Sequence, residues 1–169
     1  LNPFTLSQLE QLIKYKKQKD KIRAEAKRDK RSRRRQIVLD MSPSAPIPMI
    51  YSSPYKVSAI SFVDSTGEPW PILRKNGTDN VLDKTVKASE GDFTIFAKAV
   101  DDRETGNVIV ELKGLDKPIA LDVKDTGPYV DVEVTVKIPR PGPNADMTML
   151  SRPDAMDSTD PNIIRFMLN

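Results

Sequence analysis

The stretch Asp64-Ser65-Thr66-Gly67-Glu68-Pro69-Trp70-Pro71-Ile72 holds the only tryptophan of the chain between two prolines and directly follows an apolar run at residues 57–63. Thr66-Gly67 predicts a tight turn, because glycine tolerates a positive φ. Pro69 and Pro71 fix φ on either side of Trp70 and remove two backbone donors that a central strand needs. The stretch therefore predicts a strand, a turn and a second strand at a sheet edge or bulge. The indole anchors a small core in the favoured interpretation and faces a partner in the alternative.

Short apolar runs separated by turn residues predict strands on both sides of this stretch. The clearest run is 129–138, where Val130, Val132, Val134, Val136 and Ile138 alternate with polar residues, so that one face is core and the other, with Asp131, is solvent or interface. Turn residues such as Asn76-Gly77 separate the runs. The expected strands are residues 36–40, 56–63, 70–73, 93–99, 107–113, 119–123 and 129–138. About seven short strands predict a mainly β fold, a small β-sandwich.

A helix is expected at the N-terminus. Thr5-Leu6-Ser7-Gln8 fits a capping box, so the helix begins there. Leu6, Leu9, Leu12 and Ile13 share one face at helical spacing, but this apolar stripe ends at residue 13. The next residues favour helix without offering an apolar face to bury. We expect one or two docked helical turns followed by a frayed or partner-dependent arm.

Charge divides the chain into two parts. Residues 1–35 carry 13 Lys/Arg and 4 Asp/Glu, a net charge of +9, whereas residues 36–169 carry 14 and 20, a net charge of −6. A basic arm on an acidic body can bind a polyanion, an anionic membrane surface or an acidic neighbour, including a second copy. The arm has no interleaved aromatic residues for base stacking, which favours a solvated or protein-docking arm. The residues expected to act electrostatically are Lys27, Arg28, Lys30, Arg31, Arg33, Arg34 and Arg35.

The composition argues against an enzyme. The chain has no Cys and no His, which removes thiol nucleophiles, histidine bases and the usual zinc ligand sets. Phosphate loops, dinucleotide fingerprints and nucleophile elbows are absent from the sequence. Asp101-Asp102-Arg103-Glu104 is interpreted as a charged hairpin tip rather than as a Ca²⁺ or acid/base site. We therefore predict no catalytic residue, metal or cofactor. No apolar run approaches the roughly 20 residues that span a bilayer.

Two stretches resemble motifs of a known family. Ser53–Val57 followed by Phe62–Ile72, and then Val130–Ala145 with its Pro139-Arg140-Pro141-Gly142-Pro143-Asn144 segment, are similar in kind and order to motifs of the DotH/IcmK/TraN family of type IVB secretion and conjugation systems. The resemblance covers roughly residues 36–145. It marks a set of structural or interface residues, namely Asp64, Gly67, Pro69, Trp70, Pro71, Pro139, Gly142, Pro143 and Asn144.

This resemblance implies a function and a location. Family members are non-enzymatic subunits of the envelope-spanning core complex, so a homo-oligomeric ring in the periplasm, at the outer membrane of a Gram-negative bacterium, is expected. The implied partners are outer-membrane lipoproteins and an inner-membrane-anchored subunit, and the system transfers DNA, protein or both. The expected domains are a basic helical arm at 1–35, a periplasmic β-sandwich at 36–140, and a Pro-rich linker and tail at 141–169 that leads to a further C-terminal domain.

Two other function classes are alternatives for this sequence. A nucleic-acid-binding module would use the basic residues of 14–35, and its affinity would fall steeply with salt. We do not expect such direct binding, because the attached body is acidic. An enzyme acting on the cell wall would need paired acids in a cleft, and the acidic clusters lie on predicted turns.

Overall fold

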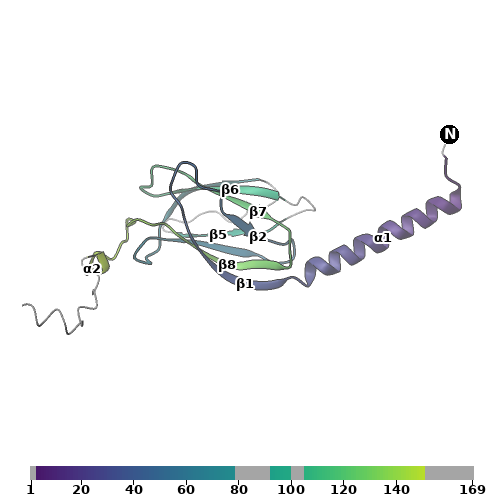
Figure 1. The fold of residues 1–169 in the computed structure, drawn as a ribbon, viewed down its shortest axis with the longest axis horizontal. Coiled ribbons are helices and arrows are strands. Elements are labelled where there is room, and N and C mark those ends of the chain that lie inside the picture. The colour runs from purple at the N-terminus through teal and green to yellow at the C-terminus, as the bar shows by residue number, and fades with distance from the viewer. Residues whose placement is uncertain (1–2, 79–91, 100–104, 151–169) are drawn as a thin grey trace, which may run out of the picture.

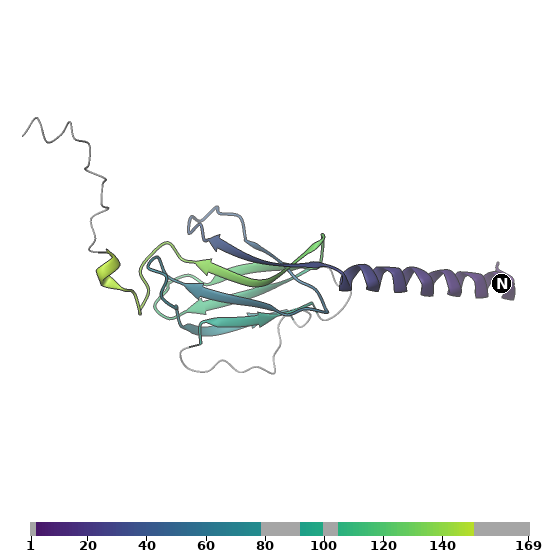
Figure 2. The same cartoon turned by 90° about the horizontal axis from the view of Figure 1, so that it is seen from below.

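In the described residues, eight strands form two sheets that pack face to face, and a long helix projects from one end (Figures 1 and 2). The computed structural model describes residues 3–78, 92–99 and 105–150. The first sheet has the strand order β1 (Arg31–Val38), β8 (Tyr129–Lys137), β3 (Ser58–Val63) and β5 (Thr94–Ala97). The second has the order β2 (Met49–Tyr51), β7 (Ile119–Lys124), β6 (Thr105–Leu112) and β4 (Ile72–Gly77). The predicted mainly β sandwich is confirmed.

The core lies between the two sheets. Alternate residues of a strand point to opposite faces, so each strand sends every second side chain inward. Complete burial of one aliphatic side chain contributes about 1.5–3 kcal/mol before conformational entropy is subtracted. The core side chains that are fully inaccessible are Ile50, Ile60, Phe62, Ile95, Val108, Val110, Leu121, Val134, Val136 and Ile138.

Most predicted strands are found within a few residues of their expected bounds, with three differences. β1 begins at Arg31 rather than at residue 36, because it pairs in parallel with β8 along its whole length. β2 was not predicted, since it is only three residues long and directly follows Pro48. The predicted turn at Asn76-Gly77 is wrong, because both residues pair with β6 as part of β4.

Strand β8 departs from the alternation that its sequence suggests. Arg33 of β1 pairs with Asp131, but the next residue, Arg34, pairs with Glu133, so Val132 is an extra residue in a bulge. The bulge shifts the inward and outward faces by one position. Asp131 is therefore fully buried, and its predicted position on the solvent or interface face is wrong.

Helix α1 (Leu6–Arg28) begins at the predicted capping box, where Thr5 Oγ1 accepts from the Gln8 backbone and Gln8 Oε1 accepts from the Thr5 backbone. The predicted docking of its first turns is wrong. Leu6, Leu12 and Ile13 are 78%, 49% and 54% exposed. The reason is geometric, since the apolar stripe lies in the part of the helix farthest from the sandwich (Figures 1 and 2).

At the opposite end of the sandwich, the chain leaves β8 and forms the short helix α2 (Met147–Leu150) (Figure 1). Neither helix in the described residues is long and apolar enough to cross a membrane. The acidic cluster at 101–104 and the tail from residue 151 onward lie outside the described residues.

Replacing Phe62 by alanine should lower the free energy of unfolding by about 3–5 kcal/mol, because a fully buried ring leaves a cavity between the sheets. Phe96→Ala is the matched control, since this phenylalanine of β5 is 43% exposed, and it should cost clearly less. Urea unfolding followed by tryptophan fluorescence measures both. Equal losses would contradict the described packing of the first sheet.

Candidate functional site

The two family-like motifs meet at the end of the sandwich from which α2 emerges. Ser65 N donates to Arg140 O at 3.1 Å, and Gly142 N donates to Asp64 Oδ2 at 3.0 Å. Asn144 Nδ2 donates to Pro69 O at 3.2 Å. Segments more than 70 residues apart in sequence therefore form one unit, which we call the motif junction and define as residues 64–71 and 139–146.

Asp64 is the centre of the motif junction. The residue is 1% exposed. Besides Gly142 N, it accepts from Thr66 N at 2.8 Å, Thr66 Oγ1 at 2.6 Å and Glu68 N at 3.0 Å. Burial alone would raise the pKa of Asp64, but the hydrogen bonds from Thr66, Gly142 and Glu68 outweigh burial and hold the pKa below its ordinary value. The buried carboxylate is thus ionised and links both motifs.

The turn that Asp64 begins reverses the chain direction. Gly67 N donates to Asp64 O at 3.1 Å, and Gly67 adopts a φ of 92°, a conformation that other residues rarely adopt. The chain then runs back beside β3, where Pro69 bridges Val63 and Trp70 N donates to Phe62 O at 2.9 Å. From there it enters β4 of the other sheet. The predicted strand, turn and edge segment are confirmed.

Trp70 packs inside the motif junction rather than facing solvent. The side chain is 2% exposed, and its Nε1 donates to Lys113 O at 2.8 Å. The indole lies against Gly142, where an added Cβ would be only 3.0 Å from Cδ2 and Cε3 of the ring. The favoured prediction of a core anchor is confirmed. A side chain at position 142 would require the indole to shift by a few tenths of an ångström, so the close approach favours glycine there.

The prolines of the second motif lie at the surface of the motif junction. Pro139 and Pro143 are exposed, as is Asn144, while Pro69 and Pro71 of the first motif are half-buried. The motif residues thus divide into buried members, Asp64 and Trp70, that organise the turn and exposed members that a partner can reach.

The predicted arm divides in the middle, and its boundary at residue 35 falls inside β1. Lys27 and Arg28 end α1, whereas Arg31–Arg35 belong to the first sheet. Lys30 is buried at the base of the helix, and its Nζ lies 2.5 Å from Asp125 Oδ1. Arg34 forms an exposed ion pair with Glu133 at 2.8 Å. Lys30 and Arg34, which were expected to belong to a solvated arm, therefore form ion pairs with carboxylates of the sandwich.

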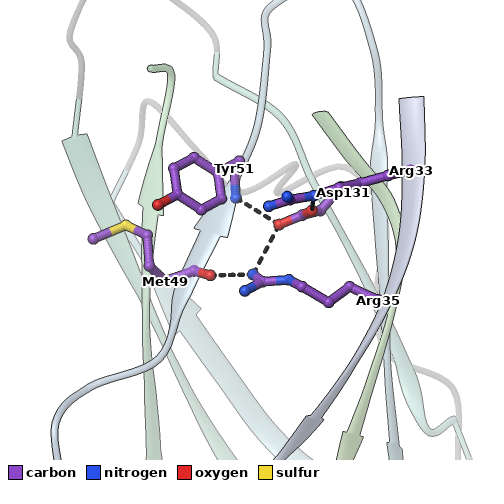
Figure 3. A network of polar contacts seen from close by, with 5 residues as sticks. All are labelled: Arg33, Arg35, Met49, Tyr51 and Asp131. Atoms are coloured by element: carbon purple, nitrogen blue, oxygen red, sulfur yellow. Dashed lines mark hydrogen bonds and ion pairs between the residues drawn. The ribbon is translucent and has the colours of Figure 1, made fainter. Parts of the chain in front are cut away.

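A third buried carboxylate, that of Asp131, binds Arg33 and Arg35 of β1 (Figure 3). Asp131 Oδ1 accepts from Arg33 Nε at 2.5 Å, and Asp131 Oδ2 accepts from Arg35 Nη2 at 2.8 Å and from Tyr51 N at 3.0 Å. Arg35 also donates to Met49 O. The network joins β1 and β8 of the first sheet to β2 of the second, so it closes one side of the sandwich.

Aromatic rings cover the Arg33 guanidinium in this network. Its Cζ lies 5.2 Å from the ring centroid of Tyr51 and 5.1 Å from that of Tyr129, within the range of a cation–π interaction. This cluster was not predicted, because the alternation of residues 129–138 places Asp131 on the outer face. The available signal was the alternation of Arg33, Arg35, Ile37 and Leu39, which predicts one inward face of a strand.

Three buried carboxylates bind other parts of the chain. Asp64, Asp125 and Asp131 are each buried and each receive hydrogen bonds or ion pairs from the chain itself. In the described part of the chain, no group of three or more acidic residues is placed to hold a metal ion. The arrangement gives a β-sandwich with an exposed helix at one end and the motif junction at the other.

A comparison with known protein families gives a match over the whole chain. The family model described as "Putative outer membrane core complex of type IVb secretion", that of DotH and IcmK, matches residues 1–169. The match includes α1 and residues 31–35 of β1, which lie outside the 36–145 region of motif resemblance. No curated protein matches the chain. The family expected from the two motifs is confirmed.

Asp64→Asn should lower the free energy of unfolding by about 1–3 kcal/mol, because an amide nitrogen would face Gly142 N, another donor. The loss should depend on pH. The ionised carboxylate contributes fully above the unfolded pKa of about 4, and its contribution is lost as the pH falls through the lower folded pKa. Urea unfolding between pH 7 and pH 3 should show the two proteins converging in acid. A constant difference, or an equal loss in the exposed control Asp116→Asn, would contradict this role.

Lys30→Met should cost about 3–5 kcal/mol, because it leaves the buried Asp125 carboxylate without its lysine. Arg34→Met is the control in the neighbouring strand, since the Arg34 side chain is 81% exposed, and it should cost at most about 1 kcal/mol. Adding Asp125→Leu to Lys30→Met should restore much of the lost stability. Similar costs for Lys30→Met and Arg34→Met in thermal or urea unfolding would refute the buried pair.

Proposed function

Because this chain belongs to the DotH/IcmK family of the type IVB secretion outer membrane core complex, we propose that it is a structural, ring-forming subunit of that complex. In this proposal the protein works in the periplasm, at the outer membrane of a Gram-negative bacterium. Its partners are copies of itself, outer-membrane lipoproteins and an inner-membrane-anchored subunit. The system that it serves secretes protein or transfers plasmid DNA by conjugation, and the chain itself is no enzyme.

The observation that best supports an assembly role is the exposure of α1. Helices in proteins gain most of their stability by packing an apolar face. This 23-residue helix instead leaves Leu6, Leu12 and Ile13 exposed at a distance from the sandwich. An unpacked apolar stripe at the end of a long helix is typical of a segment that is covered by another subunit.

The outermost strands of the two sheets, as the described residues form them, give further support. β1 and β5 end the first sheet, and β2 and β4 end the second. β1 is eight residues long, and Val38 is 63% exposed. Edge strands offer unpaired backbone groups to a neighbouring chain. A subunit that packs beside copies of itself can use such edges, and rings arise when a heterologous contact closes by rotation.

The revised charge distribution weakens the nucleic-acid alternative. With β1 assigned to the sandwich, residues 1–29 carry eight Lys/Arg and four Asp/Glu, a net charge of +4, and residues 30–169 carry 19 and 20, a net charge of −1. Lys30, Arg33, Arg34 and Arg35 form ion pairs with the chain's own carboxylates. Fewer cations are therefore left for phosphates than the sequence suggests.

The proposal is tested by photo-crosslinking in the native envelope, with the full-length protein. A photoreactive residue is placed in turn at Val38 of β1 and at Leu73 of β4, both exposed. We expect crosslinks to a second copy from at least one position, and co-purification with outer-membrane lipoproteins. Recovery of nucleic acid or cytoplasmic proteins alone would overturn the ring-subunit function and support the basic helix as a polyanion-binding module.

A further inference from the structure

Strand β2 lies at one edge of the second sheet, and two of its backbone groups point away from its neighbour β7. Pro48 O and Ser52 N form hydrogen bonds with β7 at 3.0 Å and 2.8 Å. Because the backbone groups of successive residues in a strand point to opposite sides, Met49 O and Tyr51 N point to the free side. A parallel strand added there would bond both groups through a single residue, with its N–H on Met49 O and its C=O on Tyr51 N.

The ion pair of Arg35 and Asp131 occupies the place of that residue (Figure 3). Arg35 Nη2 donates to Met49 O, as the N–H of an added strand would. Asp131 Oδ2 accepts from Tyr51 N at 3.0 Å, as the carbonyl of an added strand would. The two side-chain atoms lie 2.8 Å from each other. We propose that this ion pair closes the edge of β2 to strand addition by another chain.

The closing pair is held in place by its surroundings. Asp131 is fully buried, and its other oxygen accepts from Arg33 Nε at 2.5 Å. The Arg33 guanidinium lies against the rings of Tyr51 and Tyr129. Opening the edge would leave a buried charge without its partners, which is strongly unfavourable. Inward-pointing charged side chains are a known protection of edge strands, so the closure is a stable feature of the folded chain.

Strand β1, on the same side of the sandwich, is not closed in this way. Arg31 N and Leu39 N donate to β8, so the alternate residues 32, 34, 36 and 38 direct their backbone groups away from β8. In the sheet that the described residues form, β1 has no neighbour on that side. The ion pair therefore restricts strand addition on this side of the molecule to β1. This follows from the contacts of the chain alone and does not rest on the proposed function.

Amide hydrogen exchange in the full-length protein tests the contact with β2 directly. The triple variant Arg33→Met, Asp131→Leu and Arg35→Met replaces the whole charged cluster by apolar side chains, which proteins tolerate better than the loss of one partner. The Tyr51 amide should then exchange about 10- to 100-fold faster, because its hydrogen bond to a carboxylate is lost. The Ser52 amide, which donates to β7, should keep its rate.

Sedimentation of the same proteins measures whether the opened edge recruits a second copy. The triple variant should shift to larger species at concentrations where the wild-type chain does not. Adding Met49→Pro should remove this shift, because proline blocks the free side of β2 and leaves the pairing with β7 intact. Lys30→Met with Asp125→Leu is the matched control, since it replaces the buried pair at the base of α1, and it should sediment as the wild type does.

The single variant Arg35→Met keeps the test decisive if the triple variant does not fold. It leaves Asp131 paired with Arg33 and frees only Met49 O. It should therefore give a smaller shift to larger species, which Met49→Pro again removes. The Tyr51 amide should stay protected in this variant, because its acceptor is retained.

Three results would overturn the closure. The first is a Tyr51 amide that exchanges at the wild-type rate in a folded triple variant. The second is sedimentation of the triple variant, or of Arg35→Met if the triple variant is unfolded, that does not differ from the control pair. The third is a shift to larger species that survives Met49→Pro, since association would then use another surface.

Discussion

The carboxylate of Asp64 is the contact on which the motif junction depends. A buried anion is costly unless it is fully hydrogen-bonded, and Asp64 is satisfied only when two distant segments meet. Its hydrogen bonds fix the turn after β3, which sends the chain from the first sheet to the second. They also hold the segment after β8 against Trp70. The carboxylate thus couples the crossover between the sheets to the path by which the chain leaves the sandwich.

A similar principle operates at the side of the sandwich. Arginine has a long apolar stem and a charge that is never lost, so it can line an interior only opposite a carboxylate. Asp131 supplies that carboxylate because a bulge turns it inward. Because β1 belongs to the sandwich, the net charge of residues 30–169 is only −1, and the net positive charge is confined to residues 1–29, which include α1. Packing of apolar surface, rather than attraction between oppositely charged domains, becomes the main candidate force for assembly.

Local signals in the sequence were sufficient for much of this structure. The capping box at Thr5, the apolar alternation of residues 134–138 and the proline-flanked Trp70 each predicted what is found, because each depends on neighbouring residues. The failures involve distant partners. Asp131 could not be placed because a one-residue bulge depends on pairing with β1, about 100 positions away. Arg33 and Arg35 were assigned to the basic arm because they stand in a dense run of basic residues. Their period of two with Ile37 and Leu39, which is typical of a strand, was given less weight.

The family, the buried hydrogen-bonded carboxylates and the exposed helix together fit a structural subunit of a larger complex. Entry of the chain through α1 at one end and exit past the motif junction at the other suit a subunit with different contacts at each end. Electron cryomicroscopy of the core complex isolated from the envelope tests this account most directly. The expected result is several copies of the β-sandwich related by one rotation axis, with α1 of each copy in contact with a neighbouring subunit. A single copy in each particle, or a complex without this chain, would contradict it.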